Sequence, residues 1–458
     1  MDRRHRTLRH AGSLLAVLAI AAMSAGRGVG QEGDPSAAFM DWARSAAIPV
    51  DMTSVGVEWA SLEALRQLVG DARIVAISEG VHGGAEPLVM RNRMLEYLVR
   101  EMGFGAIAIE SGIAEGRVEH DYVRGGPGDL DEIVAQGFSW TFDQFPQNRD
   151  LVQWLREENM TRSDSDKIDF YGFDVPGSPG NTQANRGMRT GLEEAVSYLA
   201  SVDPEAGAMF EAQMPKAEHY QLDVVGGRGY ALSDVDRDRV TALVTELISL
   251  LRRNEIRYAA ASTPEAYAWG LRTAIGAIQA DTWLRRIPRG WGMSEFQSGE
   301  TAPLIEAHAL RDRAQADNIR WVLEREGPSA KVVLFAANAH TSAAPLKSFQ
   351  SSGAVGTVKA GNYLRRWYGP DYFVIGNTVR AGGFGCGNRI PLPELDPSSL
   401  PSALGQVGMN HLFLDLRTAT GEAREWLEAE KAVGPFNKAY LMDAYDILFY
   451  VDEVTPAC

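Results

Sequence analysis

The sequence predicts an α/β fold with a mainly parallel central sheet, helices on both faces and a large helical insertion. Short apolar runs rich in Ile and Val are separated by segments in which apolar residues recur every three or four positions. That alternation is expected of a parallel sheet with crossover helices. Residues 181–325 contain few strand-like runs and form the predicted insertion. With 45% hydrophobic and 23% charged residues, the 458-residue chain has ample material for a core.

Residues 1–30 have the three parts of an export signal. Ser13 to Ala22 form a short apolar segment, small residues follow it, and cleavage is expected after Ala25 or Gly30. The preceding basic region contains Arg3, Arg4, Arg6 and Arg9. An uncleaved anchor is the alternative, but the apolar run is short for a bilayer span. We therefore predict a signal peptide at 1–30, a mature domain at 31–458 and a secreted or periplasmic protein.

The formal net charge of −15 concerns solubility more than chemistry. No dense Lys/Arg tract follows the predicted signal, so the sequence predicts no nucleic-acid partner. Beyond the signal, no segment has the length and apolar purity of a transmembrane helix, so it also predicts no integral membrane segment.

Residues 73–110 predict a β-α-β unit. Two short apolar runs, Ile74–Ile77 and Ala106–Ile109, have strand character, and the helix-period segment Leu88–Met102 lies between them. Two parallel strands need a crossover connection of this kind.

Further elements follow the same reasoning. Strands are also predicted at Ile168–Phe173, Val332–Ala336, Tyr372–Ile375, Leu412–Leu416 and Ile447–Val451. Helices are also predicted at Ala37–Ala47, Leu62–Val69, Gly112–Val123, Leu130–Gln136 and Asn148–Glu158. The insertion carries an aromatic cluster of Trp269, Trp283, Trp291 and Phe296, which either packs its helices together or lines an apolar pocket.

Polar and ionisable residues stand at the carboxyl ends of four predicted strands. They are Glu79 and His82, Glu110, Asp174, and Asn338 with His340. In open parallel sheets, ligands bind beyond these strand ends. If the strands are neighbours, the side chains converge on one rim and form a candidate site.

The residue types at this rim suit water activation. Histidine titrates near neutrality, so His82 is the candidate general base, with Glu79 or Glu110 holding its ring. We expect His340 to polarise a carbonyl or protonate a leaving alcohol. Arg91, on the crossover helix, would offset the negative charge of a tetrahedral intermediate.

Each of these residues also has a purely structural interpretation. A histidine after a strand is commonly a hydrogen-bonding loop residue, Glu110 can cap a helix, and Arg91 can be a surface charge.

Asp174 and Asn338 are the candidate substrate-binding residues. The remaining histidines of the mature chain, which we expect to be structural, are His120, His219, His308 and His411.

Nucleophile and metal motifs give no further support. The chain contains neither a G-x-S-x-G elbow nor an H-E-x-x-H helix. A divalent metal site built from Glu79, His82, Glu110 and His340 stays open, because three ligands suffice for a catalytic site. The preferred hypothesis requires no cofactor.

Only two cysteines occur, Cys386 and Cys458. An exported chain would meet an oxidising compartment in which they can pair, and two free thiols are the alternative. Two cysteines are too few for a Cys₄ zinc site. The glycine-rich run Gly382–Gly387 follows a strand, but no helix pattern follows it, which weakens its interpretation as a phosphate loop.

Several of these residues together resemble the erythromycin esterase family. The resemblance is carried by Ser78-Glu79-Gly80-Val81-His82-Gly83, Arg91, Gly103-Phe104, Glu110, Ala114-Glu115-Gly116, Tyr171-Gly172-Phe173-Asp174, Arg311-Asp312 with Asn318, and Asn338-Ala339-His340. It implies a hydrolase of the kind that opens macrolide lactone rings, with a role in antibiotic resistance. In that family the histidine matching His82 is the base that activates water, and residues matching Glu79, Arg91, Glu110 and His340 complete the site.

The sequence thus predicts an exported hydrolase whose partner is a small-molecule ester or lactone. A metal-dependent hydrolase using the same residues is one alternative. A non-enzymatic protein that holds a ligand in the same cleft is the other.

Overall fold

The structure is a computed structural model that describes residues 37–52, 62–176, 188–214, 233–287, 302–345, 347–348, 358–434 and 437–458. The predicted signal peptide therefore lies outside the described residues, as do His219, Trp291 and Phe296.

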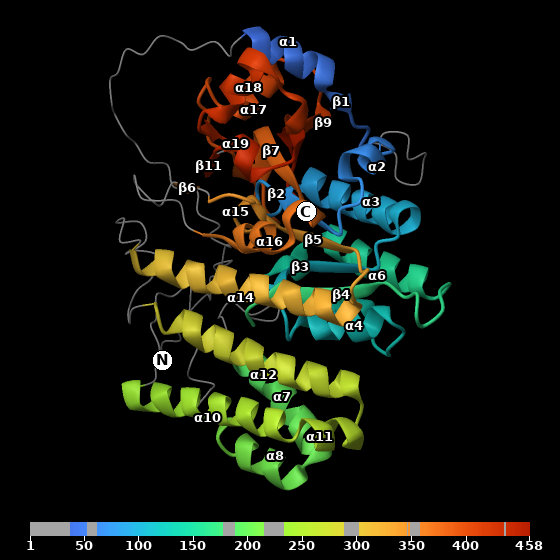
Figure 1. Cartoon of the computed structure of the whole chain (residues 1–458), viewed down its shortest axis with the longest axis vertical. Helices are drawn as coiled ribbons and strands as arrows, with labels where there is room; N and C mark the ends of the chain where they lie inside the picture. Colours follow the sequence, from blue (N-terminus) through green and yellow to red (C-terminus); the bar gives the residue numbers. More distant parts are fainter. Residues whose placement is uncertain are drawn as a thin grey trace, which may run out of the picture.

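A nine-stranded sheet forms the centre of the protein (Figure 1), with the strand order β1-β9-β12-β7-β2-β5-β3-β4 and β8 paired to β7. Its strands are β1 Ile48–Pro49, β2 Ile74–Glu79, β3 Ala106–Gly112, β4 Asp169–Asp174, β5 Val332–Ala337, β7 Tyr372–Phe384, β8 Ile390–Pro391, β9 His411–Asp415 and β12 Ile447–Val454. All pairings from β12 to β4 are parallel, whereas β9, β1 and β8 pair antiparallel. The predicted mainly parallel sheet is confirmed.

One later strand separates the two strands of the predicted β-α-β unit. β5 pairs in parallel with β2 on one side, through Ile77 and Phe335, and with β3 on the other, through Ile109 and Phe335. The crossover helix α3 (Ala85–Met102) therefore joins strands that are not neighbours. As a result, the end of β5 stands between the ends of β2 and β3.

The two faces of the sheet bury different sets of side chains. Along β2, Val75 and Ile77 point into one hydrophobic cluster, and Ile74 and Ala76 point into the other, as the two-residue period of a strand requires. The first face is covered by α2 Ala64–Val69, α3, α4 Gly116–Val123, α5 Leu130–Gly137 and α6 Pro146–Asn159. The second is covered by α1 Ala37–Ala46, α16 Ala360–Tyr368, α17 Leu400–Gly405, α18 Gly421–Glu428, α19 Leu441–Ala444 and part of α14.

Shorter elements complete this part of the chain. They are η2 Phe142–Gln144, α15 Asn338–Thr341, η3 Gly369–Asp371, η4 Leu416–Thr418 and a small sheet of β6 Lys347–Ser348, β10 Lys431–Ala432 and β11 Asn437–Ala439.

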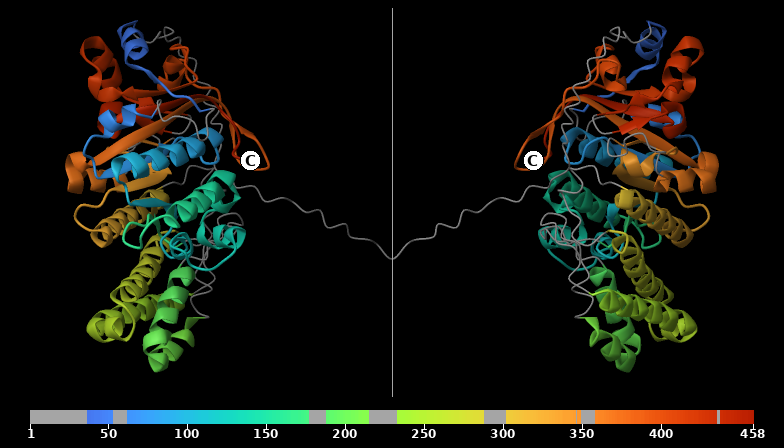
Figure 2. Two further views of the ribbon diagram at one scale, coloured as in Figure 1. Left: turned by 90° about the vertical axis from the view of Figure 1, so that its right-hand side faces the viewer. Right: turned by 90° about the vertical axis from the view of Figure 1, so that its left-hand side faces the viewer.

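The predicted insertion is helical and forms a lobe beside the sheet (Figures 1 and 2). It contains α7 Arg189–Val202, α8 Pro204–Glu211, α10 Asp234–Arg253, α11 Glu255–Ala261, α12 Pro264–Leu284 and α14 Ala302–Glu326. The lobe has its own hydrophobic cluster, to which α14 contributes Ala307 and Ala314. Further along α14, Ile319 and Val322 enter the cluster on the sheet. The middle of α14 therefore lies where lobe and sheet meet.

The aromatic residues of the lobe that the structure describes are packed, not open. Trp269 is 3% exposed, stacks on Tyr171 and meets Trp321 edge to face at 5.0 Å between ring centroids. Trp283 is also buried, and its ring meets that of Trp140 edge to face. Both therefore join helices to the rest of the core.

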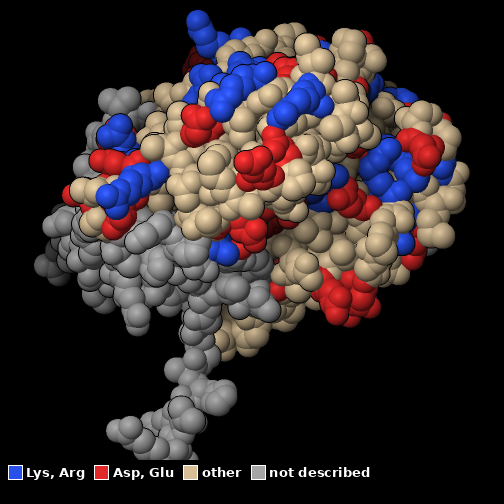
Figure 3. Space-filling model, turned by 90° about the horizontal axis from the view of Figure 1, so that it is seen from below, with Lys and Arg blue, Asp and Glu red and all other residues tan. Residues whose placement is uncertain are grey.

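Acidic and basic side chains are interspersed on the described part of the face shown in Figure 3. None of the helices in the described part of the chain combines the length and apolar character that crossing a bilayer requires.

Candidate active site

His82 lies in the turn between β2 and α3, where an entirely buried strand ends. Its Nδ1 is 2.6 Å from Oε1 of Glu79, whose side chain is 2% exposed, while the side chain of His82 is 26% exposed. A carboxylate on Nδ1 selects the tautomer whose Nε2 carries the lone pair. Burial lowers the pKa of His82, but the charge of Glu79 and its hydrogen bond outweigh burial and leave this pKa above its usual value.

Glu110, His340 and Asp312 form a second group at the same rim. His340 Nε2 is 3.1 Å from Glu110 Oε1, and its Nδ1 is 2.7 Å from Asp312 Oδ1. Burial alone would lower the pKa of His340, but the two carboxylates raise it to about 9. His340 is therefore an imidazolium at neutral pH, enclosed by two buried acids.

Arg311 connects three of the predicted strand ends. Its guanidinium donates to Asp174 and to Glu110 Oε1, and its Nη1 lies 3.3 Å from His340 Nε2. The second oxygen of Glu110 accepts the backbone N–H of Ala337 at 2.9 Å. Burial, the largest influence, raises the pKa of Glu110, but His340 and Arg311 together hold it well below the usual range. The carboxylate is therefore charged and fully hydrogen-bonded.

Asp174 holds Arg311 in place. It is fully buried, and its oxygens accept hydrogen bonds from Arg311, from the indole of Trp140 at 3.1 Å and from the N–H of Val175 at 2.8 Å. Trp140 and Thr141 both have positive φ, 63° and 65°, which costs free energy in residues other than glycine. Such strain is held where surrounding contacts over-determine it. The contacts of Asp174 favour a role in positioning Arg311, and its predicted role in substrate binding stays a prediction.

Asn338 has a comparable positioning role. Its side-chain nitrogen donates to the carbonyl of Asn377 at 2.6 Å, and its oxygen accepts the N–H of Asn377 at 3.0 Å. Asn377 in turn accepts the N–H of Gly80, in the turn that carries His82, at 2.7 Å. The amide of Asn338 joins the end of β5 to the middle of β7, so its contacts give no support to substrate binding by this side chain.

Arg91 is fully buried and is not a surface charge. Its guanidinium donates to Asn148 Oδ1 at 2.7 Å, to Asn92 Oδ1 and to the carbonyl of Gln147, and it lies over the ring of Phe335. Burial lowers the pKa of Arg91 to about 9, against the opposing charge of Glu79. These contacts favour fixing the start of α6 over direct contact with a substrate, and the predicted role in oxyanion stabilisation stays a prediction.

Three residues of the site were not assigned to it from the sequence, although Arg311-Asp312 is one of the motifs that carry the family resemblance. Arg311 and Asp312 come from the middle of α14, and Lys359, just before α16, lies 3.5 Å from Asp312 Oδ2. His308, one turn earlier on α14, was expected to be structural. Burial, together with the positive charges of Lys359 and Arg311, lowers the pKa of His308 to about 3.

The donor set is a poor match for a divalent metal. In the described ranges, no three His, Cys, Asp or Glu side chains are arranged to hold a metal ion. Both nitrogens of His340 and both oxygens of Glu110 already have partners, and the cation of Arg311 lies among them. A metal cation there would be repelled by both Arg311 and the imidazolium of His340.

Comparisons with known proteins agree with this architecture. The sequence model of the erythromycin esterase family matches residues 99–454. Erythromycin esterase type II of Escherichia coli is 24% identical over 438 residues, covering 91% of this chain and 97% of that protein.

Solved structures share the fold. A crystal structure of a succinoglycan biosynthesis protein superposes with a TM-score of 0.72 at 21% identity, covering 91% of this chain and 97% of the other. A mutant erythromycin esterase in an open conformation superposes with a TM-score of 0.67 at 16% identity, covering 89% and 97%. The family match extends over most of the chain, including its C-terminal third, and this protein belongs to the erythromycin esterase family.

Proposed function

We propose that this protein is an exported hydrolase that cleaves an ester or lactone, with a macrolide as the first candidate substrate, by means of water activated by His82. The family supports a hydrolase with a small-molecule substrate. The observation that carries the mechanism is the 2.6 Å contact between His82 Nδ1 and a buried Glu79, because it leaves Nε2 as the nitrogen with the basic lone pair.

The reaction then follows from the charges around the rim. His82 Nε2 takes a proton from water as the water oxygen forms a bond to the acyl carbon. Negative charge that develops on the carbonyl oxygen is stabilised by the cations His340 and Arg311. When the bond to the alcohol oxygen breaks, the leaving alkoxide takes the proton of His340 Nε2, which faces Glu110 Oε1 in the free protein. The proton held by His82 then passes through solvent to His340. Water and ester give acid and alcohol with no net change in the protein.

The oxygens of Glu110 and the nitrogens of His340, which would have to bind a metal, already have hydrogen-bond partners. This favours a metal-free route over a metal-dependent one. Export is supported by the basic and apolar N-terminal segments. It is also supported by the disulfide between Cys386 and Cys458, since such bonds persist in oxidising compartments.

The test is turnover of a panel of macrolides, simple lactones and esters, with and without chelator. We expect chelator-insensitive turnover of at least one substrate and a loss of about 10²-fold or more in His82→Ala. His411→Ala is the matched control, because His411 lies on β9, three strands from β2, and should retain activity. Near-normal turnover by His82→Ala would refute the role. Loss of turnover on chelation would favour the metal-dependent alternative.

A further inference from the structure

The C-terminal segment of the chain holds the turn that carries His82. The carbonyl oxygen of Gly83, the next residue, accepts two backbone hydrogen bonds, from Gly385 and from Ala457, each at 2.9 Å. Ala457 N–H also reaches the carbonyl of Gly385 at 3.1 Å. Two segments far apart in sequence therefore converge on one carbonyl beside the proposed base.

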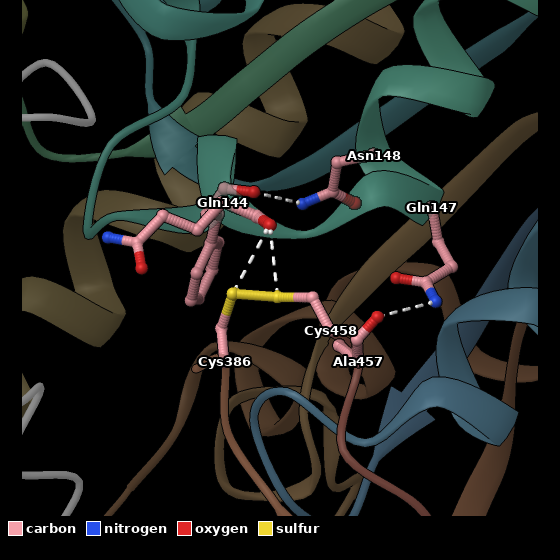
Figure 4. The surroundings of a disulfide bond; sticks show 7 residues. Gln144, Gln147, Asn148, Cys386, Ala457 and Cys458 are labelled. Atoms are coloured by element: carbon pink, nitrogen blue, oxygen red, sulfur yellow. Dashed lines mark hydrogen bonds between the residues drawn. A yellow bond between two sulfur atoms is a disulfide. The ribbon is translucent and has the colours of Figure 1, made fainter. Parts of the chain in front are cut away.

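A disulfide closes this arrangement. Cys386 and Cys458 are bonded to each other (Figure 4). Each directly follows one of the two donors, Gly385 and Ala457. The predicted pairing is thus present, with a Cα–Cα distance of 4.7 Å. The glycine-rich run that contains Cys386 is the end of β7 and a hairpin to β8, not a phosphate loop.

The turn is built for close backbone approach. Gly83 has φ +78°, and a Cβ on it would lie 3.1 Å from the backbone of Gly385. On the other side, Ala85 N–H donates to Thr455 O at 2.8 Å, and Glu86 accepts the N–H and hydroxyl of Thr455, also at 2.8 Å. The segment Thr455–Cys458 therefore fixes both the turn and the first residues of α3.

The same disulfide touches the aromatic cover of His82. The carbonyl oxygen of Gln144 lies 3.5 Å and 3.3 Å from its two sulfurs, and Gln147 Nε2 donates to Ala457 O at 3.2 Å (Figure 4). Phe142, in the same η2 turn as Gln144, has its ring 5.3 Å from that of His82. The disulfide therefore restrains both the backbone of Gly83, next to His82, and the turn that carries the Phe142 ring.

We propose that Thr455–Cys458, closed by the Cys386–Cys458 disulfide, is a positioning segment that keeps the imidazole of His82 on Glu79. This inference rests on the proposed function and adds a covalent requirement to it. Opening the bond frees the two donors of Gly83 to move independently. Small displacements of a base reduce the rate while leaving much of substrate binding intact.

Reduction tests this directly, because Cys458 is exposed and Cys386 half-buried. Dithiothreitol transfers two electrons and two protons to the bond, giving two thiols and the cyclic disulfide of the reagent. We expect kcat to fall about tenfold or more, KM to change by less than about twofold, and reoxidation to restore the rate. The double variant C386S/C458S should have the kcat and KM of the reduced enzyme, and dithiothreitol should not change them.

A substrate-free measurement separates positioning from stability. The imidazole of His82, assigned in histidine-labelled protein with the His82→Gln variant, is titrated by NMR in both redox forms, below the melting temperature of each. Glu79 raises the pKa of His82, so loosening the turn should lower that pKa. The acidic limb of kcat/KM should shift to lower pH by the same amount.

Identical His82 titrations and identical kcat in the two forms, with only the melting temperature lowered, would overturn the inference and leave a purely stabilising disulfide. Absence of any His82-dependent turnover in the oxidised protein would instead contradict the proposed function, and the NMR result would still decide whether His82 is positioned this way.

Discussion

Glu110 and Glu119 are nine residues apart and almost equally buried, 4% and 0% exposed, yet their surroundings are opposite. Glu110 accepts hydrogen bonds from Arg311 and from Ala337 and faces the imidazolium of His340. Within the described residues, neither carboxyl oxygen of Glu119 has a hydrogen-bond partner. Burial raises the pKa of Glu119 well above the usual range, whereas the partners of Glu110 hold its pKa well below it. Partners, and not burial, decide which acid is charged.

The two acids therefore affect stability with opposite signs. Glu110, with its lowered pKa, contributes stability above its unfolded pKa, and this is lost as pH falls through its folded value. Glu119, with its raised pKa, must take up a proton on folding, so its cost grows as pH rises above its unfolded value. Glu110 at the rim therefore makes the folded protein more stable at neutral pH than at acid pH, whereas Glu119 on α4 makes it more stable at acid pH.

Removing the central cation should have the largest effect. Arg311→Ala leaves the buried Asp174 and Glu110 without their shared partner, and we expect a loss of about 3–5 kcal/mol in the free energy of unfolding, measured with urea. Arg313→Ala, on the same helix, is the control. Its ion pair with Asp317 is 44% and 27% exposed, so the loss should stay below about 1 kcal/mol. Equal losses in both variants would contradict a special role for the rim.

Asp312→Asn should move the pH optimum with a smaller effect on folding. In the wild type, kcat/KM should rise as His82 loses its proton, at a higher pH than an ordinary histidine does, and fall as His340 deprotonates near pH 9. Removing the charge of Asp312 lowers the pKa of His340, so the alkaline limb should shift to lower pH while the acidic limb stays in place. If the alkaline limb of kcat/KM has the same pH midpoint in Asp312→Asn as in the wild type, His340 does not take part in the reaction as an acid.

Glu119→Gln should produce the smallest change and the opposite sign. Gln cannot ionise, so we expect this variant to be about 1 kcal/mol more stable than the wild type at pH 8, with the difference vanishing near pH 4. A Cβ on Gly137 would lie within 2.1 Å of the Glu119 carboxyl, so the near-isosteric amide is the substitution that this space accepts. A pH-independent difference in denaturant unfolding would show that Glu119 is charged after all.

The sequence was informative where a residue of the candidate site follows an apolar strand. Glu79, His82, Glu110 and His340 were found in this way, because a strand end and the rim of a parallel sheet are the same place. Arg311 and Asp312 lie inside a long helix, where periodicity does not reveal which turn meets the sheet. Their role depends on the packing of α14 between two hydrophobic clusters, which no local pattern encodes.

The fold shows the same limit. The strands β2, β3, β4 and β5 were predicted from composition, but their order was not, because nothing local indicates that β5 pairs with both β2 and β3. The roles of Arg91, Asp174 and Asn338 were read from residue type and position. Their hydrogen-bond partners, several of which lie on other elements, show what each side chain holds in place. The predicted roles in oxyanion stabilisation and substrate binding stay predictions.

The insertion of β5 between β2 and β3 also constrains how the protein folds. Ile77 and Ile109 are synthesised long before Phe335, which pairs beside both. Until β5 arrives, the edges of two very apolar strands have no partner, and such edges recruit other chains. Contacts of this range slow folding and prolong that exposure. Folding of this protein should therefore be limited by the late arrival of β5, and aggregation of the nascent chain should be most severe just before that strand is made.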